Sequence, residues 1–188
     1  MQKVHNNLGY NIFVDYAHTP NAIKTILEEQ KNFFSKLILV IGCGGNRDFS
    51  KRAKIGNIAS KICDKIIITD DNPREEDPSK IRKEIIQGIE KKFIKNVFEI
   101  PNRKEAISKS IELANKGDTI LIAGKGHETY QDYGKKILNI SDKNIVRKFD
   151  LPKKTDLKFN NSTFNSNILK KILKTKKDYK FEGISINS

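Results

Sequence analysis

The chain has 188 residues and a net charge of +13, with 36 basic and 23 acidic side chains, and 37% of its residues are hydrophobic. This composition supports one domain with a modest core and a tail. No apolar run approaches the roughly 18 residues that a membrane span requires, and the N-terminus lacks a signal-peptide pattern. We therefore expect a cytoplasmic protein with no membrane partner.

The positive charge is distributed along the chain and does not define one basic segment. Residues 151–188 contain nine lysines and three acids, which gives +6, and the first 150 residues carry the remaining +7. Nucleic-acid binding requires basic residues clustered on one face, so we expect no nucleic-acid partner. Cys43 and Cys63 lack the spacing of a metal site or a redox pair, and we expect them to be buried thiols.

Short apolar segments alternate with amphipathic helical patterns along the first 150 residues. A further strand is expected to lie antiparallel after a turn at Tyr133 and Gly134, followed by a last helix. This alternation predicts an α/β fold: a Rossmann-like, doubly wound, mostly parallel sheet of about six strands with one antiparallel edge strand, plus a C-terminal tail. The predicted strands cover residues 11–14, 37–41, 65–69, 97–100, 119–123 and 135–140.

The pattern of the first 150 residues stops at the C-terminal part of the chain. Residues 151–167 are polar and rich in asparagine and serine, which is typical of a linker. Residues 168–188 begin a new pattern of apolar positions. We interpret them as the start of a truncated following domain.

Four polar loops follow predicted strands, at residues 15–20 (DYAHTP), 42–48 (GCGGNRD), 70–74 (DDNPR) and 124–128 (GKGHE). Because the carboxyl ends of parallel strands meet at one edge of a sheet, we expect these loops to converge. Loop 70–74 combines two carboxylates, an amide and a guanidinium, which can hold a zwitterion. The alternative is an ordinary polar turn that leads into a capped helix.

The other three loops carry weaker chemical signals. In loop 15–20, Asp15 can bond a ribose hydroxyl and His18 can flank a base, although a loop histidine is often simply solvated. Loop 42–48 could meet an anion with its backbone amides, but it does not match a dinucleotide fingerprint. Loop 124–128 resembles a phosphate loop and fails its template, and the sequence contains no Walker motif.

Taken together, the four motifs resemble the C-terminal domain of the Mur ligases over about residues 8–150, and in particular the members that add diaminopimelate. The resemblance implies a domain that binds meso-diaminopimelate within an ATP-dependent peptide ligase acting on UDP-MurNAc-L-Ala-D-Glu through an acyl phosphate. ATP and Mg²⁺ would be held mainly by a central domain, which would precede residue 1 together with an N-terminal domain. The fragment alone is then expected to be inactive. The tail is similar to the start of another ligase of this family.

The resemblance also implies roles for particular residues. It gives no catalytic nucleophile and no metal ligand, and Arg74 is the natural partner for the second carboxylate that distinguishes diaminopimelate from lysine. Two alternatives remain open: a free-standing, flavodoxin-like module that binds nucleotide or phosphate without ligase activity, and a basic nucleic-acid adaptor. The implied diaminopimelate site is Arg47, Asp71, Asn72, Arg74, Gly124 and Glu128, and the implied nucleotide site is Asp15 and His18.

Overall fold

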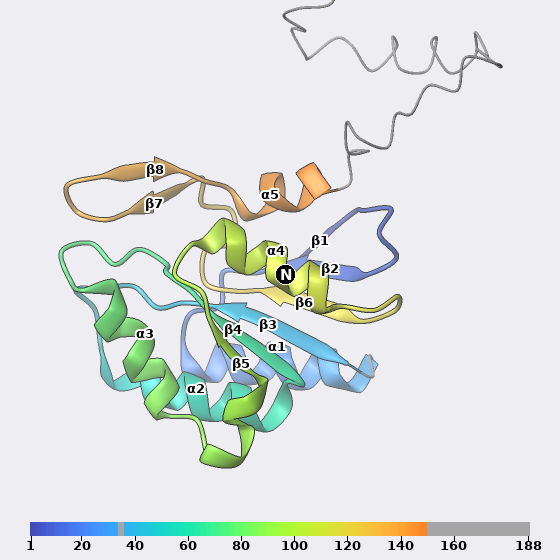
Figure 1. The fold of residues 1–188 in the computed structure, drawn as a ribbon, viewed down its shortest axis with the longest axis horizontal. Helices are drawn as coiled ribbons and strands as arrows, with labels where there is room; N and C mark the ends of the chain where they lie inside the picture. The colour runs from blue at the N-terminus through green and yellow to red at the C-terminus, as the bar shows by residue number, and fades with distance from the viewer. Residues whose placement is uncertain (34–35, 150–188) are drawn as a thin grey trace, which may run out of the picture. The chain divides into compact units, whose positions relative to one another are not determined.

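The computed structural model describes residues 1–33 and 36–149, which contain a six-stranded main sheet (Figure 1). Its strand order is β1-β2-β6-β3-β4-β5, with β1 antiparallel to β2 and every other neighbouring pair parallel. This arrangement confirms the predicted Rossmann-like α/β fold. The strands are β1 (Gln2–Val4), β2 (Asn11–Val14), β3 (Leu37–Ile41), β4 (Lys65–Ile68), β5 (Val97–Glu99) and β6 (Thr119–Ile122).

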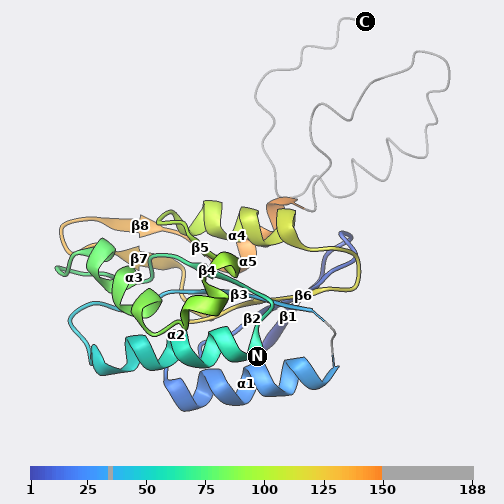
Figure 2. The same cartoon turned by 60° about the horizontal axis from the view of Figure 1, so that its bottom comes forward.

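Helices cover both faces of this sheet (Figure 2). On β3, Leu39 and Ile41 belong to the apolar cluster under α1, α2 and α3, whereas Val40 belongs to the cluster under α4 and α5. A strand covered on both faces reads as a continuous apolar run, which is why β3 is buried along its whole length. The helices are α1 (Pro20–Phe33), α2 (Ser50–Ile62), α3 (Pro78–Gln87), α4 (Arg103–Leu113) and α5 (Asp142–Phe149), and a 3₁₀ helix (Lys91–Asn96) precedes β5.

Side-chain caps fix where α3 and α4 begin. The carboxylate of Asp77 accepts a hydrogen bond from the backbone N–H of Ser79, with Pro78 at the first helical position. The amide oxygen of Asn102 accepts hydrogen bonds from the backbone N–H groups of Lys104 and Glu105, the second and third residues of α4. Each cap satisfies backbone donors that the helix itself leaves unpaired. They set the length of the loops that leave β4 and β5.

The prediction that residues 135–140 form the antiparallel edge strand of the main sheet is wrong. β7 (Tyr130–Asp132) and β8 (Ile137–Asn139) pair with each other in a separate hairpin, on the same side of the main sheet as α4 and α5 (Figure 1). The antiparallel edge strand is β1 instead. β1 has only three residues and exposes two of them, so it carries no apolar pattern that could reveal it.

Several further expectations concern burial and the ends of the chain. Cys43 is buried and Cys63 half-buried, both as free thiols. Burial raises the pKa of Cys43 to about 12, which keeps that thiol neutral.

Among the described residues, no helix combines the length and apolarity needed to cross a membrane. The predicted linker and following domain, residues 151–188, lie outside the described residues.

Candidate functional site

The four predicted loops converge at one edge of the sheet because β2, β6, β3 and β4 are consecutive parallel neighbours. Backbone hydrogen bonds join the loops in pairs. The N–H of Gly124 donates to the carbonyl of Asp15 over 3.1 Å, and the N–H of Gly45 donates to that of Asn72 over 2.9 Å. This edge is where ligands bind in open α/β sheets, and the predicted convergence is confirmed.

Asp70, the first acidic residue after β4, is paired with other side chains of the fold. Its carboxylate forms a salt bridge with Arg82 and accepts a 2.8 Å hydrogen bond from the hydroxyl of Tyr133. Burial, together with the neighbouring Asp70 carboxylate, raises the pKa of Tyr133, so this phenol stays protonated and continues to donate. Asp70 is therefore not available to a ligand.

Asp71 differs from its neighbour because its carboxylate has no hydrogen bond or ion pair within residues 1–33 and 36–149, although the residue is only 7% exposed. It lies against Gly124, where an added Cβ would come within 2.6 Å of Asp71 Oδ2. A carboxylate with no hydrogen-bond partner within the fold can accept hydrogen bonds from a cation that binds at this edge of the sheet. Asp71 is thus the strongest candidate in this loop for contact with an ammonium group.

Asn72 and Glu128 come from different loops and meet at the same point. Asn72 Nδ2 donates to Glu128 Oε2 over 2.9 Å. The buried ammonium of Lys125 donates to that carboxylate oxygen over 2.8 Å and to Asn72 Oδ1 over 2.9 Å. Burial alone would raise the pKa of Glu128, but hydrogen bonds from Lys125 and Asn72 outweigh it and lower that pKa. Glu128 therefore remains a carboxylate.

Two arginines border the glycine-rich loop on the other side of the site. Arg74 has a left-handed backbone (φ 55°), and its guanidinium donates to the carbonyl of Gly45 over 2.8 Å. Arg47 is exposed, and a Cβ added at Gly44 would lie 3.0 Å from Arg74 Nη1 and 3.8 Å from Arg47 Cγ. Both side chains pass close to Gly44, and their guanidinium groups are candidates to pair with a carboxylate.

The two residues predicted to bind a nucleotide line a separate cavity of about 430 Å³ beside α1. Asp15 Oδ2 lies 2.6 Å from the amino group of Met1, and Asp15 Oδ1 accepts a backbone hydrogen bond. The Tyr16 ring lies 5.0 Å from that of His18 and 5.6 Å from that of His127, so three aromatic rings group together. Flat aromatic surfaces of this kind can stack on a base.

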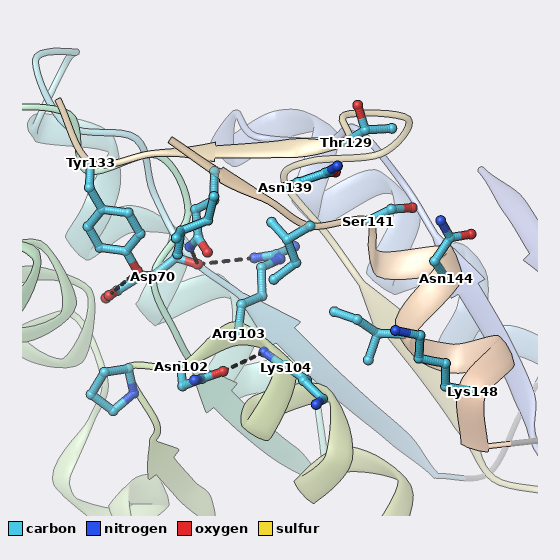
Figure 3. A pocket seen from close by; sticks show the side chains of 15 residues that line it. Asp70, Asn102, Arg103, Lys104, Thr129, Tyr133, Asn139, Ser141, Asn144 and Lys148 are labelled. Carbon is cyan, nitrogen blue, oxygen red and sulfur yellow. Dashed lines mark hydrogen bonds between the residues drawn. The ribbon is translucent and has the colours of Figure 1, made fainter. Parts of the chain in front are cut away.

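A second cavity, of about 780 Å³, lies between the start of α4, the hairpin and α5 (Figure 3). Asp70 and Tyr133 point toward each other at one side of it, and Arg103 rises from α4. None of the eight predicted site residues lines this cavity. Its one carboxylate is Asp70, which is already paired, so the candidate amino-acid site is better placed at the unpaired Asp71.

No sequence pattern identified Lys125, Arg103 and Arg52, whose almost fully buried cations organise these loops. Besides Lys125, Arg103 donates twice to Asp142 over 2.8 Å and once to the carbonyl of Ala123. Arg52 donates to Glu76 and to other acceptors in the neighbouring loops. Both arginines occupy helix positions that look solvated in the sequence, and no local pattern distinguishes them from surface residues.

The fold is that of a Rossmann-like α/β domain, the class in which ligands bind at the carboxyl ends of the parallel strands. Residues 1–126 match the family of the Mur ligase, glutamate ligase domain. Because this match covers more than half of the chain, the protein belongs to that family.

The chain is similar to several proteins named UDP-N-acetylmuramoyl-L-alanyl-D-glutamate--2,6-diaminopimelate ligase. The chain is 54% identical to the one from Rickettsia conorii over 151 residues, covering 79% of this chain and 30% of the relative. The first such ligase of Clostridium acetobutylicum is 46% identical over 147 residues, covering 77% and 30%. A solved structure of that ligase has a TM-score of 0.72 and 39% identity, covering 79% and 30%. The chain therefore spans about 30% of the length of these relatives.

Proposed function

We propose that this chain is the amino-acid-binding domain of an ATP-dependent peptide ligase, and that its amino acid is meso-diaminopimelate. The observation that carries the proposal is the Asp71 carboxylate, which accepts no hydrogen bond from the described residues and lies on the same loop as Arg74 and as Asn72, the hydrogen-bond partner of Glu128. An ammonium group fits between the two acids, and a carboxylate fits the arginine. The relatives are named as ligases of 2,6-diaminopimelate, which agrees with this ligand.

In the complete ligase, the diaminopimelate amine would attack an acyl phosphate formed on the D-glutamate carboxylate of UDP-MurNAc-L-Ala-D-Glu. The contribution of this chain is to hold the amino acid in a fixed orientation, which lowers the entropy cost of the reaction. No residue of the site needs to act as a nucleophile. The described residues offer no cluster of three metal-ligating side chains, so they do not fit a Mg²⁺ site, and we assign that ion to the rest of a longer enzyme.

We propose that Asp15 and His18 contribute to binding the nucleoside part of ATP. Both line the cavity beside α1, where the ring of Tyr16 is half exposed and available for stacking. The Asp15 carboxylate lies at the start of the same loop and can accept hydrogen bonds from ribose hydroxyls. Phosphate binding would again fall to the rest of the enzyme, because the sequence has no Walker motif.

The test of the amino-acid assignment is Arg74→Ala. Diaminopimelate carries a second carboxylate that lysine lacks, so loss of the guanidinium should weaken meso-diaminopimelate binding by on the order of 100-fold and should affect L-lysine far less. Calorimetric titration of the 188-residue chain with each amino acid gives the two affinities. Arg147→Ala, an exposed arginine on α5, is the matched control and should change neither.

Arg74 also donates to the carbonyls of Gly45 and Asn72, so its loss could act through stability alone. A lower melting temperature with an unchanged ratio of the two affinities would show that Arg74 only braces the turn, and would refute its role in ligand selection. Binding of ATP with no detectable binding of meso-diaminopimelate would favour the free-standing nucleotide-binding module instead.

A further inference from the structure

We infer that Lys125 is a positioning residue of the amino-acid site, which fixes Asn72 and Glu128 in the orientation in which they meet the ligand. The inference rests on the proposed function, because it concerns the same site. Lys125 lies on the loop after β6, between two glycines that let the backbone turn sharply. The resemblance to the ligase family assigns it no role.

The burial of Lys125 requires an explanation. Its side chain is only 1% exposed, and lysine is almost never buried unless it is paired. Its ammonium lies 2.8 Å from Glu128 Oε2, 2.9 Å from Asn72 Oδ1 and 5.5 Å from the centroid of the Tyr130 ring. These contacts give the charge a partner on three sides, so the ammonium links two loops that are separate in the sequence.

The ammonium determines which way the Asn72 amide faces. Asn72 Oδ1 accepts from Lys125 Nζ and from the backbone N–H of Asp132 over 3.0 Å. An ammonium can only donate, so the amide oxygen must face Lys125 and the amide nitrogen must face Glu128. Within the described part of the chain, this arrangement leaves one Asn72 N–H and Glu128 Oε1 without a partner. Together they offer a donor and an acceptor to a ligand.

Lys125 also sets the charge of the site. By pairing with Glu128 it offsets one carboxylate, and the Asp71 carboxylate interacts electrostatically with the buried Arg103. The ammonium of an amino-acid head therefore meets two carboxylates whose charge is already partly offset. Glu128 can then accept a hydrogen bond from that ammonium while remaining ionised.

The test compares Lys125→Met, which keeps the stem and removes the ammonium, with Lys125→Arg, which keeps a cation. In Lys125→Met we expect a higher pKa of Glu128, measured by a carbon-detected NMR pH titration, and meso-diaminopimelate binding weakened by about 10- to 100-fold. Lys125→Arg should recover part of both. The matched control is Lys104→Met, an exposed lysine on α4, which should leave both values unchanged.

The outcomes separate the inference from the proposed function. A wild-type chain that does not bind meso-diaminopimelate would overturn the proposed function. A wild-type chain that binds it, with equal affinity in Lys125→Met and an unmoved pKa of Glu128, would overturn the positioning role alone.

A measurement on the wild-type protein keeps the inference testable if Lys125→Met does not fold. One side-chain amide proton of Asn72 should exchange with solvent much more slowly than those of Asn144, which is exposed on α5. Equally fast exchange of both Asn72 protons would contradict the fixed orientation.

Discussion

At the scale of single residues, Gly124 shows how the absence of a side chain makes room for a charged one. Its φ of +105° is open mainly to glycine, and its α carbon faces the carboxylate of Asp71. The sequence predicts Gly124 as a residue that contacts the ligand. In the structure Gly124 also lies against Asp71, another predicted ligand-binding residue, so a side chain at position 124 would disturb Asp71 as well.

This geometry predicts that Gly124→Ala lowers stability and ligand affinity more than an alanine substitution at another glycine of positive φ. The new Cβ would lie 2.6 Å from Asp71 Oδ2, so the variant should lose about 1–3 kcal/mol of stability through strain and should also bind meso-diaminopimelate more weakly. Urea unfolding and calorimetric titration measure the two effects.

Gly117→Ala is the control for backbone strain alone, because its φ is +89° and a Cβ there would meet nothing within 4 Å. It should lose some stability and keep its affinity for the ligand. Equal losses of both quantities in the two variants would show that Asp71 is not displaced by Gly124→Ala.

At the scale of elements, Arg52 on α2 joins the loops that leave β3 and β4. Its guanidinium is fully buried and donates to Glu76 over 2.7 and 2.8 Å, to Glu84 on α3 over 2.7 Å and to the carbonyl of Gly44 over 3.2 Å. Hydrogen bonds from Arg52 lower the pKa of Glu76 from its ordinary 4.5 to about 2. This network connects the glycine-rich loop to α3.

The network predicts how stability depends on pH. Because the folded-state pKa of Glu76 is lowered, its contribution is fully present above pH 4.5 and is lost as the pH falls toward 2. The difference in unfolding free energy between wild type and Glu76→Gln should therefore shrink over this range in urea titrations. The control Glu105→Gln, an exposed glutamate on α4, should show little difference at any pH. A constant gap for Glu76→Gln would contradict the assignment.

At the scale of the whole molecule, the site that we propose would bind and orient an amino acid without the groups that activate a carboxylate. We expect the 188-residue chain, supplied with ATP, Mg²⁺, meso-diaminopimelate and UDP-MurNAc-L-Ala-D-Glu, to release no phosphate above background. The physical reason is that its sequence has no Walker motif to hold the triphosphate. The full-length ligase of Rickettsia conorii, assayed in parallel, provides the positive control. Turnover by the purified chain would show that it carries activating groups of its own.

The sequence by itself determined the strands that form the centre of the sheet and the convergence of four loops at one edge. These features depend on local patterns, namely the buried run of β3, and on the rule that parallel strands end together. Local patterns can be read from one segment at a time. The four family motifs could also be recognised in the sequence, because each is one short continuous run of residues.

Only the tertiary structure decided which charged side chains are paired within the fold and which remain available to a ligand. Asp70 and Asp71 are adjacent in the sequence, but Asp70 is paired through Arg82 and Tyr133, and Tyr133 lies 63 residues away from it. The burial of Lys125 is likewise set by contacts with another loop. The edge strand β1 and the placement of the β7–β8 hairpin were also decided at this level. Such partners are brought together only by packing, because burial and charge pairing are properties of the folded chain and not of any single segment.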